Sequence, residues 1–265
     1  MNLKAKSALV TGASSGIGAA VAKALSSKGV RVILLARNEA RLKQVASEIH
    51  AAGGDASYYQ VDLADADRVD HVAKQITTEL GIPDILINNA GRGQWKHIQE
   101  TSADEAWQMM EVPYFAAFNL TRAFLPEMLK RNSGHIINIS SVSSRFVWPG
   151  ATAYHAARWA LKGFTEALRS DLHGSNIGVT LFESGVVESE YWQHNPGSRE
   201  RVPKIAKLIP NLTTEQVASA IVKGIEKNKR RIVVPFMMKT VCWQHFFFPG
   251  IVQWLMTITG YRRSS

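Results

Sequence analysis

Tyr154 is followed four residues later by Arg158, within the segment TAYHAARWALKGF that spans residues 152–164. On a helix, side chains four residues apart lie on the same face, so we expect the two to be neighbours. A cation beside a phenol favours the phenolate and lowers the pKa of the tyrosine. Such a pair could exchange protons near neutral pH. Lysine is the more usual cation for that task, so the arginine raises the question of whether the site turns over.

A glycine-rich segment, VTGASSGIG at residues 10–18, lies between the first expected strand and the first expected helix. Glycines let the backbone turn tightly and approach a pyrophosphate, while the helix N-terminus favours its negative charge. A tight turn without a ligand is the alternative. The spacing favours a dinucleotide site formed by Gly12, Ser14, Ser15, Gly16, Ile17 and Gly18.

The end of the second expected strand bears on which nicotinamide dinucleotide binds. An acid about 20 residues after the glycines binds the ribose 2′-hydroxyl of NAD, whereas an arginine accommodates the 2′-phosphate of NADP. Arg37 stands at this place, no acid occupies residues 35–38, and Arg41 follows one turn later. The sequence therefore favours NADP(H) over NAD(H), with an ordinary exposed arginine pair as the alternative.

Short β-branched runs alternate with longer helix-like segments along the chain. This alternation predicts repeated βαβ units in one doubly wound, Rossmann-like α/β domain, with a parallel sheet of about seven strands and helices on both faces. We place this domain at residues 1–235 and an apolar, aromatic extension at residues 236–265. The expected strands are 7–12, 30–36, 57–62, 84–91, 134–140, 177–183 and 231–235, and the expected helices are 16–28, 38–52, 65–80, 102–131, 151–174 and 213–228.

The composition of the 265 residues excludes several classes of protein. A single cysteine, Cys242, rules out an internal disulfide and fits a reducing compartment. We see no signal peptide and no apolar window of about 20 residues, and we expect a cytoplasmic protein. The net charge is +9, but the lysines and arginines are scattered along the sequence, apart from KNKRR at 227–231. We therefore expect no nucleic-acid partner. We expect no metal site.

Together with NNAG at 88–91, INISS at 137–141 and the Tyr154 helix, these features resemble the short-chain dehydrogenase/reductase family over about residues 4–235. The resemblance implies hydride transfer between nicotinamide C4 and a carbonyl or alcohol carbon. Tyr154 would exchange the proton with the substrate oxygen, Ser141 would stabilise its charge, and Arg158 would hold the nicotinamide ribose. Further cofactor contacts are implied for Asp62, Leu63, Asn89, Ala90, Gly91, Val187 and Ser189.

Two positions depart from the family pattern in the same site. Arg158 replaces the lysine of YxxxK, and Pro113 stands where the family usually has an asparagine that helps hold a water beside that lysine. Arginine keeps the charge but effectively never deprotonates. Proline keeps a helix break but loses the amide. Two interpretations stay open: an oxidoreductase with altered proton delivery, or a catalytically impaired nucleotide-binding protein with a regulatory or scaffolding role.

Aromatic residues mark the expected substrate side and the C-terminal extension. Phe146, Val147, Trp148, Tyr191, Trp192 and His194 suit an apolar ketone, aldehyde or secondary alcohol, although they could equally be core or interface. The extension, with aromatics from Trp243 to Trp254, suits either an interfacial helix on a membrane or a helix that covers the domain or a partner subunit. Apolar surface on the helices near 105–130 and 151–174 predicts a homo-oligomer.

Overall fold

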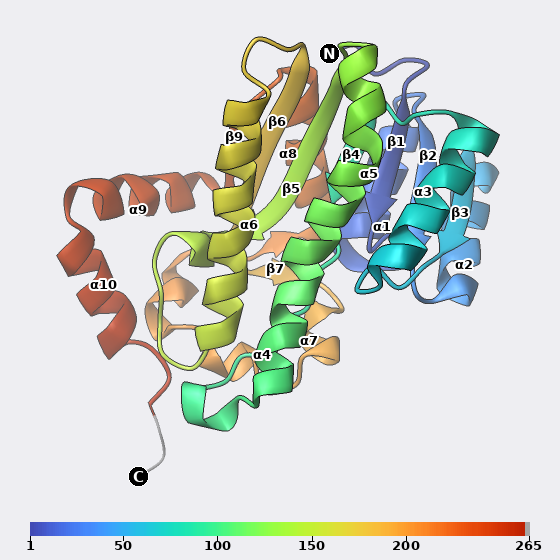
Figure 1. Cartoon of the computed structure of the whole chain (residues 1–265). Helices are drawn as coiled ribbons and strands as arrows, with labels where there is room; N and C mark the ends of the chain where they lie inside the picture. Colours follow the sequence, from blue (N-terminus) through green and yellow to red (C-terminus); the bar gives the residue numbers. More distant parts are fainter. Residues whose placement is uncertain (263–265) are drawn as a thin grey trace.

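Seven parallel strands form the central sheet, in the order β3–β2–β1–β4–β5–β6–β9. The computed structural model describes residues 1–262 (Figure 1). Strands that are apolar on both sides must be covered on both faces, as parallel sheets are. The strands are β1 Ser7–Thr11, β2 Arg31–Ala36, β3 Ala56–Gln60, β4 Ile85–Asn88, β5 Gly134–Ser141, β6 Ile177–Ser184 and β9 Arg231–Val234, with a small second sheet of β7 Val187–Glu188 and β8 Leu212–Thr213.

Helices cover the two faces of the sheet in two groups. One apolar core joins the sheet to α1, α2 and α8, and the other joins it to α3, α5 and α6. The expected doubly wound α/β fold is therefore confirmed. The helices are α1 Gly16–Ser26, α2 Glu39–Ala51, α3 Ala66–Leu80, α4 Ala103–Met110, α5 Ala116–Lys130, α6 Thr152–Asp171, α7 Tyr191–His194, α8 Thr214–Glu226, α9 Phe236–Phe247 and α10 Pro249–Ile258, with 3-10 turns at Ile98–Glu100, Val142–Ser144, Arg199–Arg201 and Lys204–Leu208.

Polar caps fix where several of these helices begin. The Asn38 side chain accepts a hydrogen bond from Arg41 N at the start of α2, and Asp65 does the same for α3. Ser102 opens α4 with a reciprocal capping box that includes Glu105. Each cap satisfies an N–H group that the helix itself cannot pair.

The expected helix at 102–131 is interrupted, which corrects that prediction. A π-helical turn, Glu111–Phe115, separates α4 from α5, and Val112 inside it has φ −133° and ψ 105°. A residue before proline avoids the helical region because of the clash with the ring, so Pro113 explains the break. The freed carbonyl of Val112 accepts a hydrogen bond from Arg92 N at 3.3 Å.

The C-terminal extension forms two helices rather than the single interfacial helix considered above. Pro249 begins α10 directly after α9, and the pair projects from one edge of the domain (Figure 1). Among residues 1–262, no helix combines the length and apolar character that crossing a bilayer requires.

Candidate active site

A large cavity lies at the carboxyl ends of the strands, where ligands bind in doubly wound sheets. Its volume is about 1390 Å³, well above the several hundred Å³ that a single drug-sized ligand usually occupies. It therefore has room for a dinucleotide and a substrate together. The expected site residues that line it are Gly12, Ser14, Ser15, Gly16, Ile17, Arg37, Asp62, Leu63, Asn89, Ala90, Gly91, Ser141, Tyr154, Arg158, Val187 and Ser189.

The glycine-rich turn is packed as a cradle that larger side chains would fill. Gly12 has φ +63°, and a Cβ there would lie 3.0 Å from the Asn89 amide nitrogen. A Cβ on Gly18 would lie 2.2 Å from the Gly12 carbonyl oxygen. Gly18 is absent from the cavity lining, so it acts through the close packing of α1 on the turn and not as a direct wall.

The NNAG segment holds this turn in place. Asn89 Nδ2 donates to the Thr11 carbonyl at 2.9 Å, and the backbone N–H groups of Asn89 and Ala90 both donate to Thr11 Oγ1 at 2.9 Å. Within the described chain the N-cap of α1, Ser15, makes no side-chain capping bond, and the first turn of α1 has no acid. The N-terminal N–H groups of α1 are therefore open to an anion, and these residues fit a dinucleotide pyrophosphate.

Arg37 and Arg41, the two arginines expected near the ribose 2′-position, have different surroundings. Arg41 forms an ion pair with Glu190, which follows β7 on the far side of the cleft. Arg37 is exposed at the cavity edge and makes no ion pair within residues 1–262. Asp62 also lines this end, where one of its oxygens accepts from Ala64 N at 3.1 Å. Arg37 is therefore the cation that a ligand could reach without displacing a protein carboxylate.

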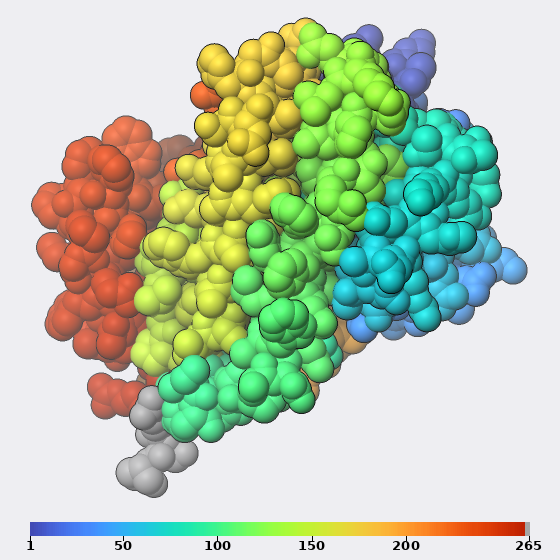
Figure 2. Space-filling model, in the orientation of Figure 1, coloured from blue at the N-terminus to red at the C-terminus, as the bar shows by residue number. Residues whose placement is uncertain are grey.

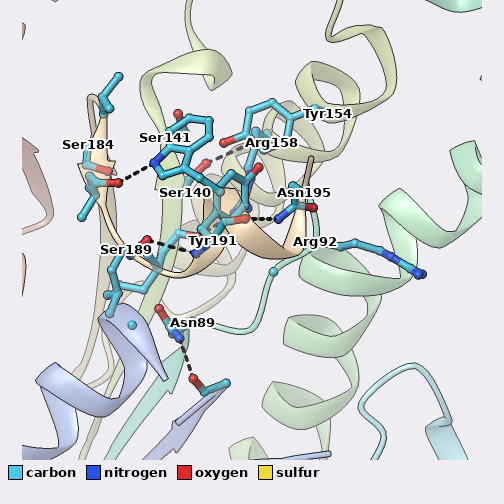
Figure 3. A pocket seen from close by; sticks show the side chains of 18 of the residues that line it. Asn89, Arg92, Ser140, Ser141, Tyr154, Arg158, Ser184, Ser189, Tyr191 and Asn195 are labelled. Carbon is cyan, nitrogen blue, oxygen red and sulfur yellow. Dashed lines mark hydrogen bonds between the residues drawn. The ribbon is translucent and has the colours of Figure 1, made fainter. Parts of the chain in front are cut away.

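Ser141 and Tyr154 lie at the other end of the cavity, beside Arg158 and Tyr191 (Figure 3). Ser141 ends β5, and its Oγ accepts a hydrogen bond from Ser143 N at 3.3 Å. The hydroxyl proton of Ser141 is therefore left to donate to a ligand. Tyr154, in the first turn of α6, is 6% exposed, so its ring is sheltered from water at the cavity wall.

Arg158 packs over the face of the Tyr154 ring and is itself buried. Its Cζ is 5.1 Å from the centroid of the Tyr154 ring, and Nη1 donates to the Ile139 carbonyl at 3.1 Å. Its Nε has no hydrogen-bond partner among residues 1–262. A Cβ on Gly91 would lie 2.8 Å from Arg158 Nη2, so the glycine of NNAG leaves room for the broader guanidinium.

Trp95 is a site residue that the motifs did not indicate. Its ring lies 5.0 Å from the ring of Tyr154, and its Nε1 donates to the Tyr191 hydroxyl at 3.0 Å. Burial is the main cause that raises the pKa of Tyr191 well above its usual value, so this phenol stays protonated. The available signal was positional, because Trp95 follows β4 at the ligand-binding edge of the sheet.

Two segments that wall the cavity, one after β4 and one that begins with α7, are hydrogen-bonded to each other. Gly93 N donates to Asn195 Oδ1 at 3.0 Å, Trp95 N donates to Ser198 Oγ at 3.1 Å, and Ser198 Oγ donates to the Gly93 carbonyl at 3.2 Å. A Cβ on Gly93 would lie 1.4 Å from the Tyr191 hydroxyl oxygen, so any larger residue there would displace the Tyr191 ring. We name residues 92–97 with 191–198 the roof.

The segment after β5 is positioned by buried polar groups. His155 Nδ1 lies 3.1 Å from the Ser143 carbonyl, and His155 Nε2 accepts from Trp148 N at 3.1 Å. Burial lowers the pKa of His155 to about 4, so the imidazole is neutral at pH 7. The fully buried Glu183 on β6 pairs with Arg145 at 2.7 Å. These contacts fix a segment that carries two aromatic residues of the cavity wall.

The expected substrate side is largely where the sequence placed it. Phe146, Trp148, Tyr191, Trp192 and His194 all line the cavity. Val147 does not: it is 37% exposed, and its backbone pairs with the Gln253 amide of α10, with Gln253 Nε2 donating to the Val147 carbonyl at 2.9 Å. This interaction ties the C-terminal helices to the substrate side, which the sequence left open.

The C-terminal helices form part of the same wall. Met238, Val252 and Met256 are buried in one apolar cluster with Trp95 and Tyr154. The inner side of α9 and α10 therefore closes the cavity. Further aliphatic lining comes from Val241, Leu255 and the segment 205–209.

Known proteins resemble this chain in sequence and in fold. A family model described as short chain dehydrogenase matches residues 6–199. A fatty acyl-CoA reductase of Acinetobacter baylyi is 35% identical over 233 residues, which cover 87% of this chain and 76% of that protein. The chain spans between 39% and 76% of the length of the first curated relatives it matches.

Two solved structures have the same fold. A metagenomic short-chain oxidoreductase in complex with NADP is 31% identical, with a TM-score of 0.74 over 88% of this chain and 98% of that one. A Burkholderia phymatum short chain dehydrogenase/reductase in complex with NAD superimposes with a TM-score of 0.85 over 100% and 99% of the two chains, at 23% identity. The family model and the relatives together show that the chain is a member of the short-chain dehydrogenase/reductase family of oxidoreductases.

Proposed function

We propose that this protein is an NADP(H)-dependent oxidoreductase that transfers hydride between nicotinamide and an apolar aldehyde, ketone or secondary alcohol. One observation carries the proposal: Ser141 and Tyr154 line the same cavity as the phosphate turn and Arg37. Because they share one cavity, a nicotinamide bound there and the Tyr154 hydroxyl could reach the same substrate carbonyl.

The nucleotide would be held along the cavity floor. The N-terminus of α1 and the glycine turn would bind the pyrophosphate, and Asp62 and Leu63 would contact the adenine end. Ala90 and Gly91 of NNAG, with Val187 and Ser189 opposite, would enclose the nicotinamide half. When bound, the nicotinamide supplies or accepts the hydride.

The side chains of this protein would handle the proton and the charge. Tyr154 would pass its hydroxyl proton to the substrate oxygen as the carbonyl is reduced, and recover one in the reverse direction. Ser141 would donate a hydrogen bond to that oxygen and stabilise its developing charge. The Trp95 ring, which packs at a tilt against the ring of Tyr154, would exclude water from the reacting end.

The walls favour an apolar substrate. Aromatic rings and the aliphatic side chains of α9 and α10 surround the reacting end, where few groups could bind a charged ligand. The Acinetobacter relative is named for a fatty acyl-CoA, which supports a substrate with a long aliphatic part. We therefore treat residues 236–258 as part of the catalytic unit formed with residues 1–235.

NADP(H) is the preferred cofactor in this proposal. The exposed Arg37 has the chemistry for a 2′-phosphate, and no acid lies at the end of β2 to bind a free 2′-hydroxyl. The solved relatives include complexes with both NADP and NAD, so the choice depends on Arg37 and its neighbours.

A second candidate function is nucleotide binding with impaired catalysis. Arg158 is committed to the Tyr154 ring and the Ile139 carbonyl, and Pro113 brings no amide to the site. An arginine cannot release a proton as a lysine can. These two residues favour slow turnover, or a regulatory or scaffolding role based on binding.

The proposal extends to assembly and location. Trp107, Phe118, Leu129 and Trp159 are exposed on α4, α5 and α6, so these helices would pair with a second copy. The lone Cys242 is consistent with a reducing compartment.

The test is NADPH consumption by the full chain with aldehydes and ketones of increasing chain length. We expect turnover that rises with chain length and disappears in Tyr154→Phe, while NADPH binding followed by nicotinamide fluorescence is retained. Binding without turnover on every substrate would favour the second candidate, and absence of binding would refute both.

A further inference from the structure

The outer side of α9 and α10 is an exposed apolar surface. Its large side chains are between 42% and 79% exposed, and no other described part of the chain covers them. Figure 2 shows the two helices as a lobe that stands out at the left edge of the molecule. We name this surface the aromatic face; it consists of Phe236, Met237, Trp243, Phe246, Phe247, Phe248, Ile251, Trp254 and Ile258.

Helices α9 and α10 are apolar both on the side that faces the cavity and on the side that faces outward. Their inner residues, such as Val252 and Met256, are buried against the cavity cluster. A helix that is hydrophobic all round is normally buried on every side. Here the inner side is accounted for by the cavity, so the outer side requires a partner of its own.

The C-terminal part of the sequence, which contains the aromatic face, carries charge of one sign. The first 226 residues carry 24 lysines and arginines against 22 acids, whereas the last 39 residues carry seven against none. Lys239 lies within the face, with its Nζ 5.8 Å from the centroid of the Phe236 ring. Helices α9 and α10 themselves thus carry one cation, Lys239, and no carboxylate.

We propose that the aromatic face docks the protein on an anionic lipid surface. Exposed tryptophan and phenylalanine side chains with flanking cations are what inserts at the boundary between headgroups and acyl chains. Anionic headgroups attract nearby lysines and arginines. A second copy of this chain is a poorer partner, because a twofold contact through the face would bring two copies of Lys239 together with no carboxylate from α9 or α10 to pair with them.

The proposal also gives the substrate a route, and this part rests on the proposed function. Met237 belongs to the aromatic face and also lines the cavity, and Leu255 of α10 is a second lining residue. Leu208, also a lining residue, is 73% exposed. An apolar substrate could pass from the lipid between α9, α10 and segment 204–209 to Tyr154 without crossing water.

The experiment measures co-sedimentation of the full chain with vesicles of phosphatidylcholine alone or mixed with phosphatidylglycerol. The apolar variant is Trp243→Gln with Phe246→Gln, and its matched control is Trp107→Gln, because Trp107 is 63% exposed on α4. The charge variant is Lys239→Glu, with Lys74→Glu on α3 as its control. Thermal unfolding of each variant checks that the fold is retained.

We expect binding to the anionic vesicles that falls about tenfold or more in the apolar variant and several-fold in Lys239→Glu. The two controls should bind like the unaltered protein. Quenching of tryptophan fluorescence by brominated lipids, reduced in Trp243→Phe, should locate the contact without relying on the double variant.

Equal binding by the apolar variant and the unaltered protein would overturn the proposal. So would a lipid-free dimer in sedimentation that dissociates in the apolar variant, since the face would then bind a second copy. Neither readout requires turnover, so failure here is distinguishable from failure of the proposed oxidoreductase.

Discussion

The Arg158 guanidinium lies over the ring of Tyr154, with its Cζ 5.1 Å from the ring centroid. The cation thus faces the π-surface of the phenol, and a backbone carbonyl of β5 fixes one of its nitrogens. Its charge remains beside the tyrosine, but one Nη1 proton is committed to the Ile139 carbonyl, and a guanidinium does not release protons near neutral pH. The arrangement predicts that arginine preserves binding better than it preserves proton transfer.

Arg158→Lys should raise turnover severalfold while changing NADPH affinity little. The lysine keeps the positive charge near the ribose and the tyrosine, and it can take part in a proton relay. Steady-state kinetics with an apolar aldehyde, beside a fluorescence titration of NADPH, would separate the two effects. Unaltered protein with typical enzyme rates and no gain in the variant would mean that arginine is competent.

Adding Pro113→Asn to Arg158→Lys should raise turnover beyond the product of the single effects. The two positions would serve one relay, and residues that act together are not additive. Val112 is already non-helical, and an asparagine after it would have to keep that break. Multiplicative effects in the double variant would show that the two residues act independently.

Arg37→Ala should weaken NADPH about tenfold or more and leave NADH affinity nearly unchanged. A guanidinium–phosphate contact is a charge-assisted hydrogen bond, and the Arg37 group is not occupied by a carboxylate among the described residues. Titration of both cofactors by nicotinamide fluorescence measures the ratio. Arg31→Ala, which removes a cation bound to the Leu80 carbonyl away from the cavity, is the control. A ratio that stays the same in Arg37→Ala contradicts the assignment.

Gly93→Ala should lower kcat/KM by about a hundredfold. The new Cβ would meet the Tyr191 hydroxyl and displace a ring hydrogen-bonded to Trp95, and a shift of about 1 Å in a site can cost that much. Gly163→Ala is the matched control, because nothing lies within 4 Å of its Cβ. In that helical position alanine should stabilise the protein by about 1 kcal/mol. Normal kinetics for Gly93→Ala would refute the role of the roof.

Acid should destabilise the protein between pH 6.5 and 4. Burial lowers the pKa of His135 and of His155 to about 4 from 6.5, so the unfolded chain takes up these protons first. The free energy of unfolding is thus highest above pH 6.5 and falls as the pH decreases, by about 3 kcal/mol for each histidine once the pH is below 4.

Urea unfolding at pH 7 and pH 5 would measure this loss. His155→Asn should reduce the difference between the two pH values, at the cost of lower stability at pH 7, because two backbone contacts are disturbed. The exposed His173, changed to asparagine, should leave the difference unchanged. A His155→Asn protein with the full pH dependence would show that other groups control the acid response.

The motifs predicted the sheet and the cavity floor well. The motifs identified Gly12, Asn89 and Ser141, because turns and strand ends restrict which residue types can occupy those positions. Trp95 could not be found in this way, since its role depends on packing against Tyr154 from a different segment. The inner side of α9 and α10 was equally hidden, because a run of apolar residues does not reveal which of them face the protein.

Pro113 shows a different limit of predicting structure from sequence, namely where a helix ends. The sequence indicated a helix break at this residue, yet hydrophobic periodicity still joined 102–131 into one helix. Conformational restriction before proline prevailed at Val112, while the segments on each side kept their helical patterns. Local stereochemistry decided the boundary, and periodicity decided only the type of element.

The hydrogen bonds between segments 92–97 and 191–198 have a mechanical consequence. Segments on opposite sides of a cleft can move independently. These two are joined by hydrogen bonds from the backbone of the first to the side chains of Asn195 and Ser198 in the second. Moving one segment away from the other would break the bonds made by Asn195 and Ser198. Opening of the roof should therefore be cheaper when the two segments move together than when either moves alone.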